Sequence, residues 1–229
     1  MSFSVVVLSK TAANFVACAE AIRKAGETCR ICVIDDGLDL DQITATGSCT
    51  FCELDPIKTV PGEKPFVFSR NANVGIRAAG EDDVILLNDD ALLKTPAGFS
   101  QLSSVAQSHP EYGVIAAVTN STGNQAQLPQ NRGLREEPRM VCFICVYIPR
   151  KTIERVGLLD ERFIHYGMDD DDYCLRVRQA GLKIGIFDGC FVDHATLKSS
   201  FRGMPGTGGD YLPNLAIFKE KWGFDNWGN

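Results

Sequence analysis

Two short stretches of the sequence concentrate carboxylates in a way that packing does not require. Residues 169–172 are four aspartates in succession, and Asn88, Asp89 and Asp90 follow an apolar run. Adjacent ionised carboxylates repel one another and resist burial. Carboxylate and amide oxygens suit a hard divalent cation such as Mg²⁺ or Mn²⁺. A crowded carboxylate whose pKa is raised suits a general base.

Each acidic stretch also has a purely structural interpretation. Asn and Asp favour turns because their side chains bind their own backbone, which would explain residues 88–90. Acidic residues in the first turn of a helix are favoured by the helix dipole, which explains one or two of residues 169–172. Successive helical residues point about 100° apart, so four in a row cannot all face one site. We expect one or two to be functional and the others to be solvated.

The composition is that of a globular protein and limits its partners. The 229 residues, 45% of them hydrophobic and 23% charged, are enough for one domain with a sizeable core. A formal net charge of −6 argues against wide contact with nucleic acid, which needs clustered Lys and Arg. No apolar run has the length of a membrane span, and the N-terminal run is too short for a signal peptide. We therefore expect a soluble, cytoplasmic protein.

Apolar patterning predicts strands that alternate with helices along the chain. Continuous apolar runs predict buried strands at 3–9, 30–36, 83–90, 113–119, 140–148 and 182–187. Helical spacing with glycine stops predicts helices at 12–25, 71–80, 97–107, from 149 onward, at 170–180 and at 214–223. Residues 37–65 are expected to be irregular, with a weaker strand near 49–54. This alternation indicates a mainly parallel sheet with helices on both faces.

Such a sheet would bring distant acidic residues together. Asp35 and Asp36 end one predicted strand, and Asn88, Asp89 and Asp90 end another. Ligands of parallel sheets bind beyond the carboxyl ends of the strands. We therefore expect both acidic strand ends to open onto one crevice.

Four stretches, taken in order, resemble the family 2 glycosyltransferases of the GT-A fold. They are "VVVLSKTAANFVACAEAI" with "CVIDDGLD", "FSRNANVGIRAAGEDDVILLNDDALL", "GLLDERFIHYGMDDDDYCLRVRQAGLKIGIF" and "DGCFVDHA". The resemblance implies a single α/β domain over residues 1–229, with a Rossmann-like, mixed and mainly parallel sheet flanked by helices. Residues 1–95 would bind the nucleotide sugar, and residues 96–229 would form the acceptor side with a mobile loop at 198–211.

The same resemblance implies roles for individual residues. Asp90 matches the metal position of the DxD-type motif, and His194 matches a histidine that completes the metal or diphosphate site in some members. Asp169 and Asp170 match the acidic pair, with Asp170 as the expected catalytic base, although the run of aspartates allows a register shift of one residue. The matched nucleotide-binding positions are Asp35, Asp36, Arg70, Asn71, Asn88 and Asp89.

The implied activity is metal-dependent transfer of a sugar to an acceptor hydroxyl, with inversion. The donor would be a nucleoside-diphosphate sugar, UDP being the commonest nucleotide in the family. A bound Mn²⁺ or Mg²⁺ would stabilise the leaving diphosphate, and the base would take the acceptor proton. Lys198 and Arg202, in a glycine-rich loop, would close over the diphosphate, or the loop is an ordinary connection. The acceptor, whether glycan, lipid or protein, stays open.

Three alternatives come from other features of the sequence. Cys29 and Cys32, with Cys49 and Cys52, have the spacing of a four-thiolate zinc site, although the first pair lies in or beside a predicted strand. A sugar nucleotidyltransferase would normally carry an N-terminal Gly-rich phosphate loop, which "VVVLSKTAANF" lacks. A non-catalytic protein that binds nucleotide or glycan would not need a base.

Overall fold

The computed structural model describes residues 2–39, 57–164, 166–201 and 212–224. Its strands are β1 (Phe3–Ser9), β2 (Arg30–Asp35), β3 (Ile57–Pro61), β4 (Asp83–Asn88), β5 (Leu92–Leu93), β6 (Tyr112–Thr119), β7 (Leu134–Glu136), β8 (Cys145–Ile148) and β9 (Lys183–Asp193). Its α-helices are α1 (Ala12–Lys24), α4 (Phe68–Ala78), α5 (Gly98–Ser108), α6 (Arg150–Val156), α7 (Asp169–Gln179) and α8 (Leu212–Trp222).

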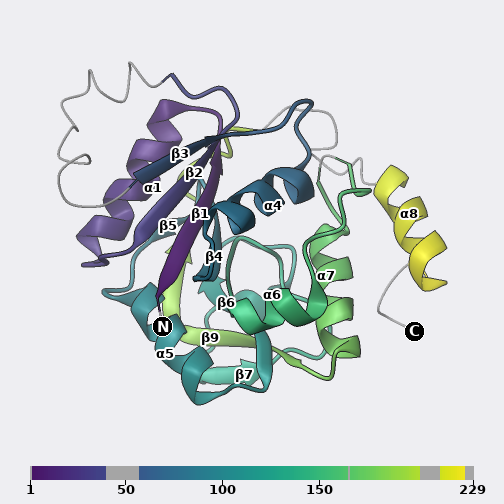
Figure 1. The fold of residues 1–229 in the computed structure, drawn as a ribbon. Helices are drawn as coiled ribbons and strands as arrows, with labels where there is room; N and C mark the ends of the chain where they lie inside the picture. Colours follow the sequence, from purple (N-terminus) through teal and green to yellow (C-terminus); the bar gives the residue numbers. More distant parts are fainter. Residues whose placement is uncertain (1, 40–56, 165, 202–211, 225–229) are drawn as a thin grey trace.

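The strands of these described ranges form one nine-stranded sheet (Figure 1). Its order is β3-β2-β1-β4-β8-β6-β9-β5, with β7 paired to β9. The strands β3, β2, β1 and β4 run parallel, β8 runs antiparallel to both of its neighbours, and β6 and β9 are parallel to each other. The mixed, mainly parallel α/β sheet expected from the sequence is confirmed.

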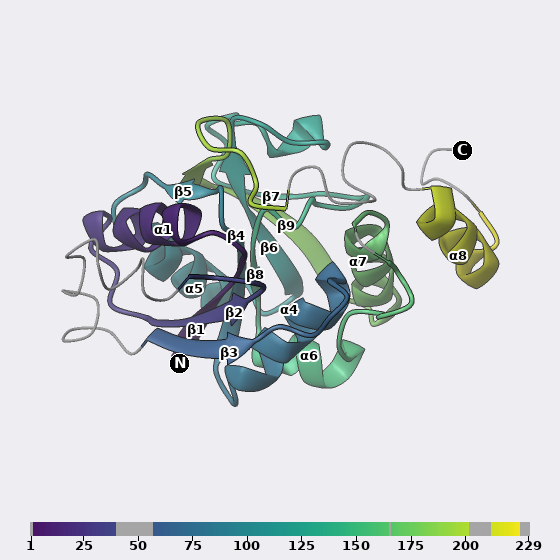
Figure 2. The same ribbon diagram turned by 90° about the horizontal axis from the view of Figure 1, so that it is seen from above.

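Alternate residues of the central strands feed two core layers. On β1, Val5 and Val7 pack with α1 and α5, whereas Val6 packs with α4, α6 and α7. Seen from above, α1 and α5 cover one face of the sheet, and α4, α6 and α7 cover the other (Figure 2). Both faces are buried, which is why the central strands have continuous apolar sequences.

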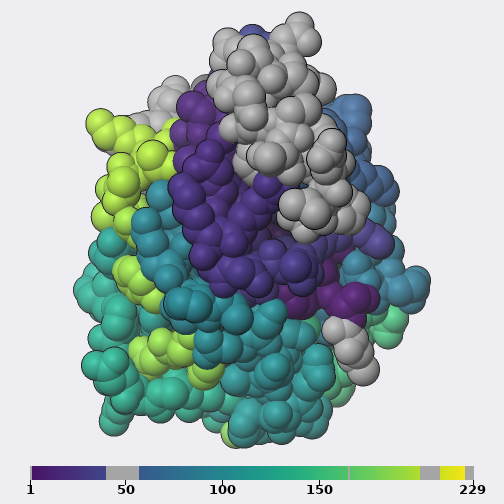
Figure 3. All heavy atoms as spheres, turned by 90° about the vertical axis from the view of Figure 1, so that its left-hand side faces the viewer, coloured from purple at the N-terminus to yellow at the C-terminus, as the bar shows by residue number. Residues whose placement is uncertain are grey.

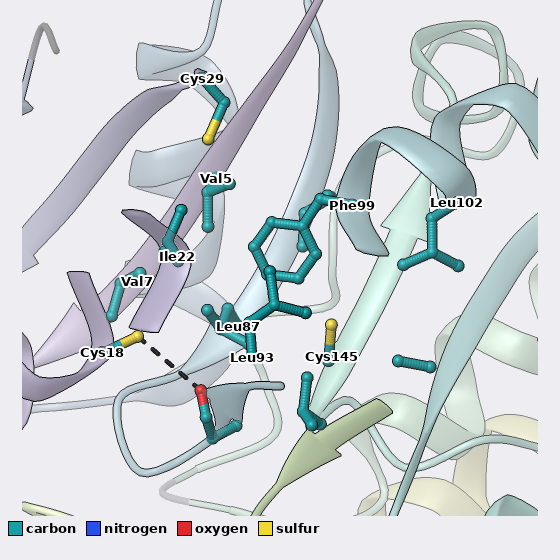
Figure 4. Packing of buried hydrophobic residues seen from close by; sticks show 14 of the residues in the cluster. Val5, Val7, Cys18, Ile22, Cys29, Leu87, Leu93, Phe99, Leu102 and Cys145 are labelled. Atoms are coloured by element: carbon teal, nitrogen blue, oxygen red, sulfur yellow. Dashed lines mark hydrogen bonds between the residues drawn. The ribbon is translucent and has the colours of Figure 1, made fainter. Parts of the chain in front are cut away.

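The layer between the sheet and helices α1 and α5 is closely packed. Ile22 of α1 and Phe99 of α5 lie among the strand residues, and the Cys18 thiol lies 3.9 Å from the carbonyl oxygen of Ala91 (Figure 4). From outside, the purple N-terminal segment that contains α1 lies above the teal segment that contains α5 (Figure 3). This layer fixes the backbone directly after β4, because Ala91 itself is fully buried.

Several predicted boundaries were wrong. Part of the segment expected to be irregular forms β3, which adds an edge strand beside β2 and ends at a proline, a residue tolerated at sheet edges. The strand expected at 140–148 begins only at Cys145. The last strand, β9, continues to Asp193, beyond the expected end at 187. The weaker strand predicted near 49–54 lies outside the described residues.

None of the helices in the part of the chain that the structure describes has the length and apolarity needed to cross a bilayer.

Candidate active site

The acidic end of β2 is held by the protein itself. Asp36 is 4% exposed, and both of its carboxylate oxygens accept hydrogen bonds from Asn71 Nδ2, at 3.0 and 2.9 Å. Lys64 Nζ donates to the Asp36 carboxylate at 2.8 Å. The neighbouring Asp35 uses Oδ1 to accept from the backbone amides of Gly37 and Leu38. These carboxylates therefore shape the turn after β2 and join it to α4.

Arg70 lies beside this cluster on α4. Its Nε is 3.3 Å from Glu63 Oε2, and its guanidinium donates to the carbonyl of Pro65. The amide of Glu63 in turn donates to Asn71 Oδ1 at 2.9 Å. Arg70 and Asn71, adjacent in sequence, thus both hold the segment directly after β3.

The end of β4 is the second acidic strand end. Asn88 ends the strand, and its amide donates to the carbonyl of Ile144. Asp89 is 2% exposed, and its carboxylate accepts from the hydroxyl of Ser9 at 2.7 Å and faces the amide of Ser200 at 3.5 Å. Burial raises the pKa of Asp89, although the Ser200 and Ser9 hydrogen bonds partly offset this. Asp89 therefore ties the ends of β1 and β4 to the segment after β9.

Asp90 has a different environment. It is 5% exposed, and its Oδ1 accepts no hydrogen bond from the residues that the structure describes. His194 Nε2 lies 3.2 Å from this oxygen, close enough for an ion pair when the ring is protonated. A buried carboxylate oxygen without a hydrogen bond is rare, because leaving it unmet costs free energy.

The His194 ring is fixed from its other side. Its Nδ1 lies 2.9 Å from the carbonyl oxygen of Ser121, and its backbone amide donates to Asn120 Oδ1. A carbonyl only accepts, so Nδ1 donates, and in the neutral ring the Nε2 lone pair faces Asp90. Burial alone would lower the pKa of His194, but Asp90 and the Ser121 carbonyl outweigh burial and raise it.

This pair fits a divalent cation. Two neighbouring ligands of an octahedral ion, each about 2.1 Å from it, stand about 3 Å apart, close to the 3.2 Å between Asp90 Oδ1 and His194 Nε2. The Ser121 carbonyl orients the imidazole as the outer partners of metal-bound histidines do. Among the described residues, no group of three His, Cys, Asp or Glu side chains is placed to hold a metal ion. A divalent cation held by this pair would need further ligands besides these two side chains.

The four consecutive aspartates begin α7 and have unequal environments. Asp169 is 5% exposed and accepts from the amide of Gly167 at 2.9 Å, and burial raises its pKa to about 6. Asp170 is only half-buried, and its Oδ1 accepts from the amide of Asp171. Desolvation together with the charges of Asp171 and Asp169 raises the Asp170 pKa well above its ordinary value.

The expectation that the remaining aspartates are solvated is wrong for Asp172, which is fully buried. Its carboxylate accepts from Arg176 Nε and from Trp222 Nε1, both at 2.9 Å, and forms an ion pair with Lys221 Nζ at 2.7 Å. Asp172 therefore fastens α8 to α7. Identical neighbours in the sequence thus have different roles, decided by the donors that each one meets.

Tyr166 connects the acidic groups in space. Burial is the main reason that its pKa is raised, and nearby carboxylates from three separate parts of the chain add to the effect. These carboxylates belong to Asp89, Asp169, Asp90 and Asp36. The structure therefore brings together the ends of β2 and β4 and the start of α7.

An aromatic cluster surrounds Tyr166, and sequence reasoning missed it. The Tyr166 ring lies 5.4 Å from Phe66, 5.5 Å from Phe68 and 6.3 Å from Phe201, centroid to centroid. Only the position of Tyr166, just before the run of aspartates, could have drawn attention to it. Asp170 lies by contrast close enough to Cys142 to help raise the pKa of that thiol to about 11, after burial.

The predicted loop is described only at its start. The carbonyl of Lys198 accepts from Asn14 Nδ2 at 2.9 Å, and the Ser200 hydroxyl accepts from the amide of Lys10. This part of the predicted mobile loop is thus attached to the turn after β1. Arg202 and the rest of the loop to 211 lie outside the described residues.

The cysteine alternative has little support from the described half of its four thiols. Cys29 packs in the core layer of α1, and Cys32 packs in the layer of α4, on the opposite face of the sheet. Two thiols on opposite faces cannot bind one ion. Cys49 and Cys52 lie outside the described residues.

Comparisons with known proteins place the fold. No family model matches the sequence, and no curated protein matches it. GalNAc-T7 with UDP, GalNAc and Mn²⁺ is similar in structure, with a TM-score of 0.69 and 12% identity over 85% of this chain and 44% of that one. The mannosyltransferase PcManGT of Pyrobaculum calidifontis, in complex with GDP-Man and Mn²⁺, has a TM-score of 0.68 and 16% identity over 88% of this chain and 58% of that one.

A third similar structure is a UTP-bound UGPase of Acinetobacter baumannii, with a TM-score of 0.55 and 12% identity over 82% of this chain and 85% of that one. This chain spans less than two thirds of the length of GalNAc-T7 and PcManGT. At these identities the likeness concerns the fold. The chain has the GT-A fold of the glycosyltransferases, as its sequence predicted.

Proposed function

We propose that the protein is a metal-dependent glycosyltransferase that moves a sugar from a nucleoside-diphosphate sugar to an acceptor hydroxyl. The observation that carries the proposal is the 3.2 Å contact between His194 Nε2 and Asp90 Oδ1, an oxygen that accepts no hydrogen bond within the described part of the chain. It lies at the carboxyl end of a parallel strand, and Tyr166 lies near both Asp90 and Asp169. The proteins with UDP or GDP-Man and Mn²⁺ that share this fold support the proposal.

Asp90 and His194 would hold Mn²⁺ or Mg²⁺, one as a carboxylate and the other through Nε2. When bound, the cation supplies a Lewis acid that neutralises the charge developing on the leaving diphosphate. The Ser121 carbonyl holds the His194 ring in the tautomer that leaves Nε2 free for this purpose.

Asp170 is the proposed base. A hydroxyl is a poor nucleophile near neutral pH and reacts faster when a carboxylate takes its proton. Because its half-buried carboxylate titrates above the ordinary range of aspartate, Asp170 accepts a proton readily. Asp169 contributes the like charge that helps to raise the Asp170 pKa, and it accepts from the Gly167 amide. One face of the sugar would then receive the acceptor oxygen while the diphosphate leaves from the other, which gives inversion.

The nucleotide would lie between the ends of β2 and β4, and UDP is the nucleotide that we propose. The side chains assigned to it are Asp35, Asp36, Arg70, Asn71, Asn88, Asp89, Lys198 and Arg202. Asp36 is already bonded to Asn71 and Lys64, so direct contact with the nucleoside requires Lys64, 59% exposed at its side chain, to move away. The division into halves at residue 95, the acceptor and a cytoplasmic location stay predictions.

The test is an assay for free nucleoside diphosphate with a panel of UDP and GDP sugars, Mn²⁺ and simple acceptors. We expect release with at least one donor, and loss of that release in Asp90→Asn. Glu136→Gln is the matched control. Glu136, at the end of β7, pairs with Lys183, at the start of β9, and both side chains are about half exposed. Binding of donor without any release would favour the non-catalytic alternative.

The likeness to a UTP-bound UGPase keeps the nucleotidyltransferase as a second candidate. Release of inorganic pyrophosphate from UTP and a sugar phosphate, without release of nucleoside diphosphate from any sugar nucleotide, would establish it. Metal analysis of the purified protein addresses the zinc alternative, since a structural zinc would be stoichiometric and resist mild chelation.

A further inference from the structure

Asn214, near the start of α8, binds the backbone that precedes the four aspartates. The side chain is 2% exposed. Its Oδ1 accepts from the amide of Ile164 at 2.8 Å, and its Nδ2 donates to the carbonyl of the same residue at 2.7 Å. Nδ2 also lies 2.9 Å from the carbonyls of Tyr166 and Gly167, so its two hydrogens are shared among three acceptors. One side chain thus satisfies four backbone groups of a single short segment.

The described residues of that segment need outside partners because they lie in no helix or strand. Gly167 and Met168 both have left-handed backbone angles, with φ of 97° and 66°. Backbone groups of such a segment cannot bond one another in a regular ladder, and burial without partners would cost free energy. The segment ends at the Gly167 amide, which donates to Asp169, the residue that begins α7. Its geometry therefore sets where the acidic pair and Tyr166 lie.

The helix that carries Asn214 is attached mainly to this acidic part of the molecule. In both ribbon views α8 lies beyond α7, away from the sheet (Figures 1 and 2). Lys221 near its end lies 2.7 Å from both Asp160 and Asp172, and Trp222 also donates to Asp172. The start of α8 thus binds the backbone before α7 through Asn214. The end of α8 binds Asp160 and Asp172 through Lys221 and Trp222.

A second buried asparagine makes the same kind of bridge elsewhere. Asn73 on α4 accepts from the amide of Leu159 at 2.9 Å and donates to the carbonyl of the same residue at 2.9 Å. Its Nδ2 also donates to Glu161 Oε1 at 2.8 Å. Asn73 is 1% exposed, so its burial matches that of Asn214. The two asparagines differ in the backbone that they bind, because only Asn214 reaches Tyr166 and Gly167.

We propose that Asn214 is a positioning residue that holds Tyr166 and the pair Asp169–Asp170 in the geometry needed for sugar transfer, without touching the substrate. The proposal rests on the proposed function, since it concerns the base of the same reaction. Removing the bridge would let the segment shift, and a displacement of about 1 Å at a catalytic group can lower the rate about 100-fold. Asp36 and Asp90 would keep their own partners, Asn71 and His194, so donor binding at the ends of β2 and β4 should change little.

The test compares Asn214→Ser with Asn73→Ser, which each remove one backbone bridge. We expect Asn214→Ser to lower kcat about 10- to 100-fold with unchanged donor KM, and to move the acid limb of the pH profile. Both serine variants should lower the midpoint of thermal unfolding by a similar amount. In Asn73→Ser, however, kcat should fall less than about threefold. Asn214→Asp, which keeps the shape but brings a carboxylate against three carbonyls, should lower kcat further. Equal losses of kcat in the two serine variants would overturn the proposal.

Hydrogen exchange separates this inference from the proposed function. If the wild-type protein transfers no sugar from any donor, the proposed function fails, and the positioning claim is then decided by the amides of Gly167 and Asp171. We expect these amides to exchange at least about tenfold faster in Asn214→Ser than in the wild type, with no such change in Asn73→Ser. Unchanged exchange at both amides would show that Asn214 does not position the segment.

Discussion

The two acidic strand ends look alike in sequence and differ in their partners. At the end of β2, Asp36 accepts from Asn71 through both oxygens and from Lys64. At the end of β4, Asp90 Oδ1 lies 3.2 Å from His194 Nε2 and accepts no hydrogen bond from any residue in the described ranges. A buried carboxylate that is hydrogen-bonded to the protein contributes to the fold, whereas a buried carboxylate oxygen without a hydrogen bond is available to a ligand. The partners, more than the residue type, distinguish a structural carboxylate from a functional one.

The largest effect on the transfer rate should come from substitution of Asp90. We expect Asp90→Asn to lower the transfer rate at least about 100-fold, because the cation loses its anionic ligand and the leaving diphosphate its stabilisation. The free energy of unfolding should change little above the pH range in which His194 is protonated, since the neutral ring forms no ion pair with Asp90. Initial rates and urea denaturation measure the two quantities. A variant that keeps full activity would remove Asp90 from the site.

Asp170→Asn should cause a loss of the same order for a different reason. The amide cannot take the acceptor proton, so kcat falls, whereas binding of UDP with Mn²⁺ should be unchanged. Isothermal titration with UDP and Mn²⁺ separates this variant from Asp90→Asn, in which binding weakens. If Asp169→Asn abolished transfer and Asp170→Asn did not, the base would be Asp169.

Removal of metal should be reversible. Treatment with EDTA should abolish transfer, and added Mn²⁺ should restore it. His194→Ala should raise the Mn²⁺ concentration needed for half-maximal activity about tenfold or more, since outer partners alone already change metal affinity by about 10- to 100-fold. Activity that persists in EDTA after dialysis would mean that the contact between Asp90 and His194 has another purpose.

Substitution of Asp36, whose carboxylate is hydrogen-bonded within the protein, should affect stability in a way that substitution of Asp90 does not. Asp36→Asn places an amide against the Asn71 donors and leaves Lys64 without its anionic partner. We expect the free energy of unfolding to fall by about 1–3 kcal/mol, as for other buried groups deprived of a partner. Denaturation midpoints of Asp36→Asn and Asp90→Asn, measured side by side, check this. If the two variants were equally stable, the hydrogen bonds of Asp36 would not distinguish the end of β2 from the end of β4.

The sequence predicted those features that depend on local patterns. Continuous apolar runs located β1 and β4 because both faces of these strands are buried, and parallel pairing then placed Asp36 and Asp90 at one edge. Contacts between distant residues left no such pattern. Glu27 accepts from the amides of Phe99 and Ser100 at the start of α5, and Asn214 binds a segment about fifty positions away.

The run of aspartates shows the same limit most directly. Asp172 stands four residues before Arg176, a helical spacing that the sequence offers and the structure uses. Lys221 and Trp222, from a separate helix, add contacts with Asp172 that no pattern in the sequence indicates. The expectation that Asp172 is solvated failed because the fold buries it among these partners.

The last expected effect is a pH dependence of stability that comes from Asp169. Burial raises its pKa to about 6, above the value of about 3.9 in an unfolded chain. The folded state therefore binds this proton more tightly, so the carboxyl contributes stability below about pH 4 that is lost as the pH rises toward 6. Carboxylates with lowered pKa values, such as Asp193 at about 2, act in the opposite direction at lower pH. The difference between wild type and Asp169→Asn isolates the contribution of Asp169.

We expect the denaturation midpoint of Asp169→Asn to gain on that of the wild type between about pH 4 and 6, and the gap to be constant above that window. The acidic start of α7 would then be a third kind of site. There the Asp169 carboxylate accepts a hydrogen bond from the Gly167 amide, yet it still exchanges a proton near pH 6. A gap that does not change with pH would mean that Asp169 titrates as an aspartate in an unfolded chain does.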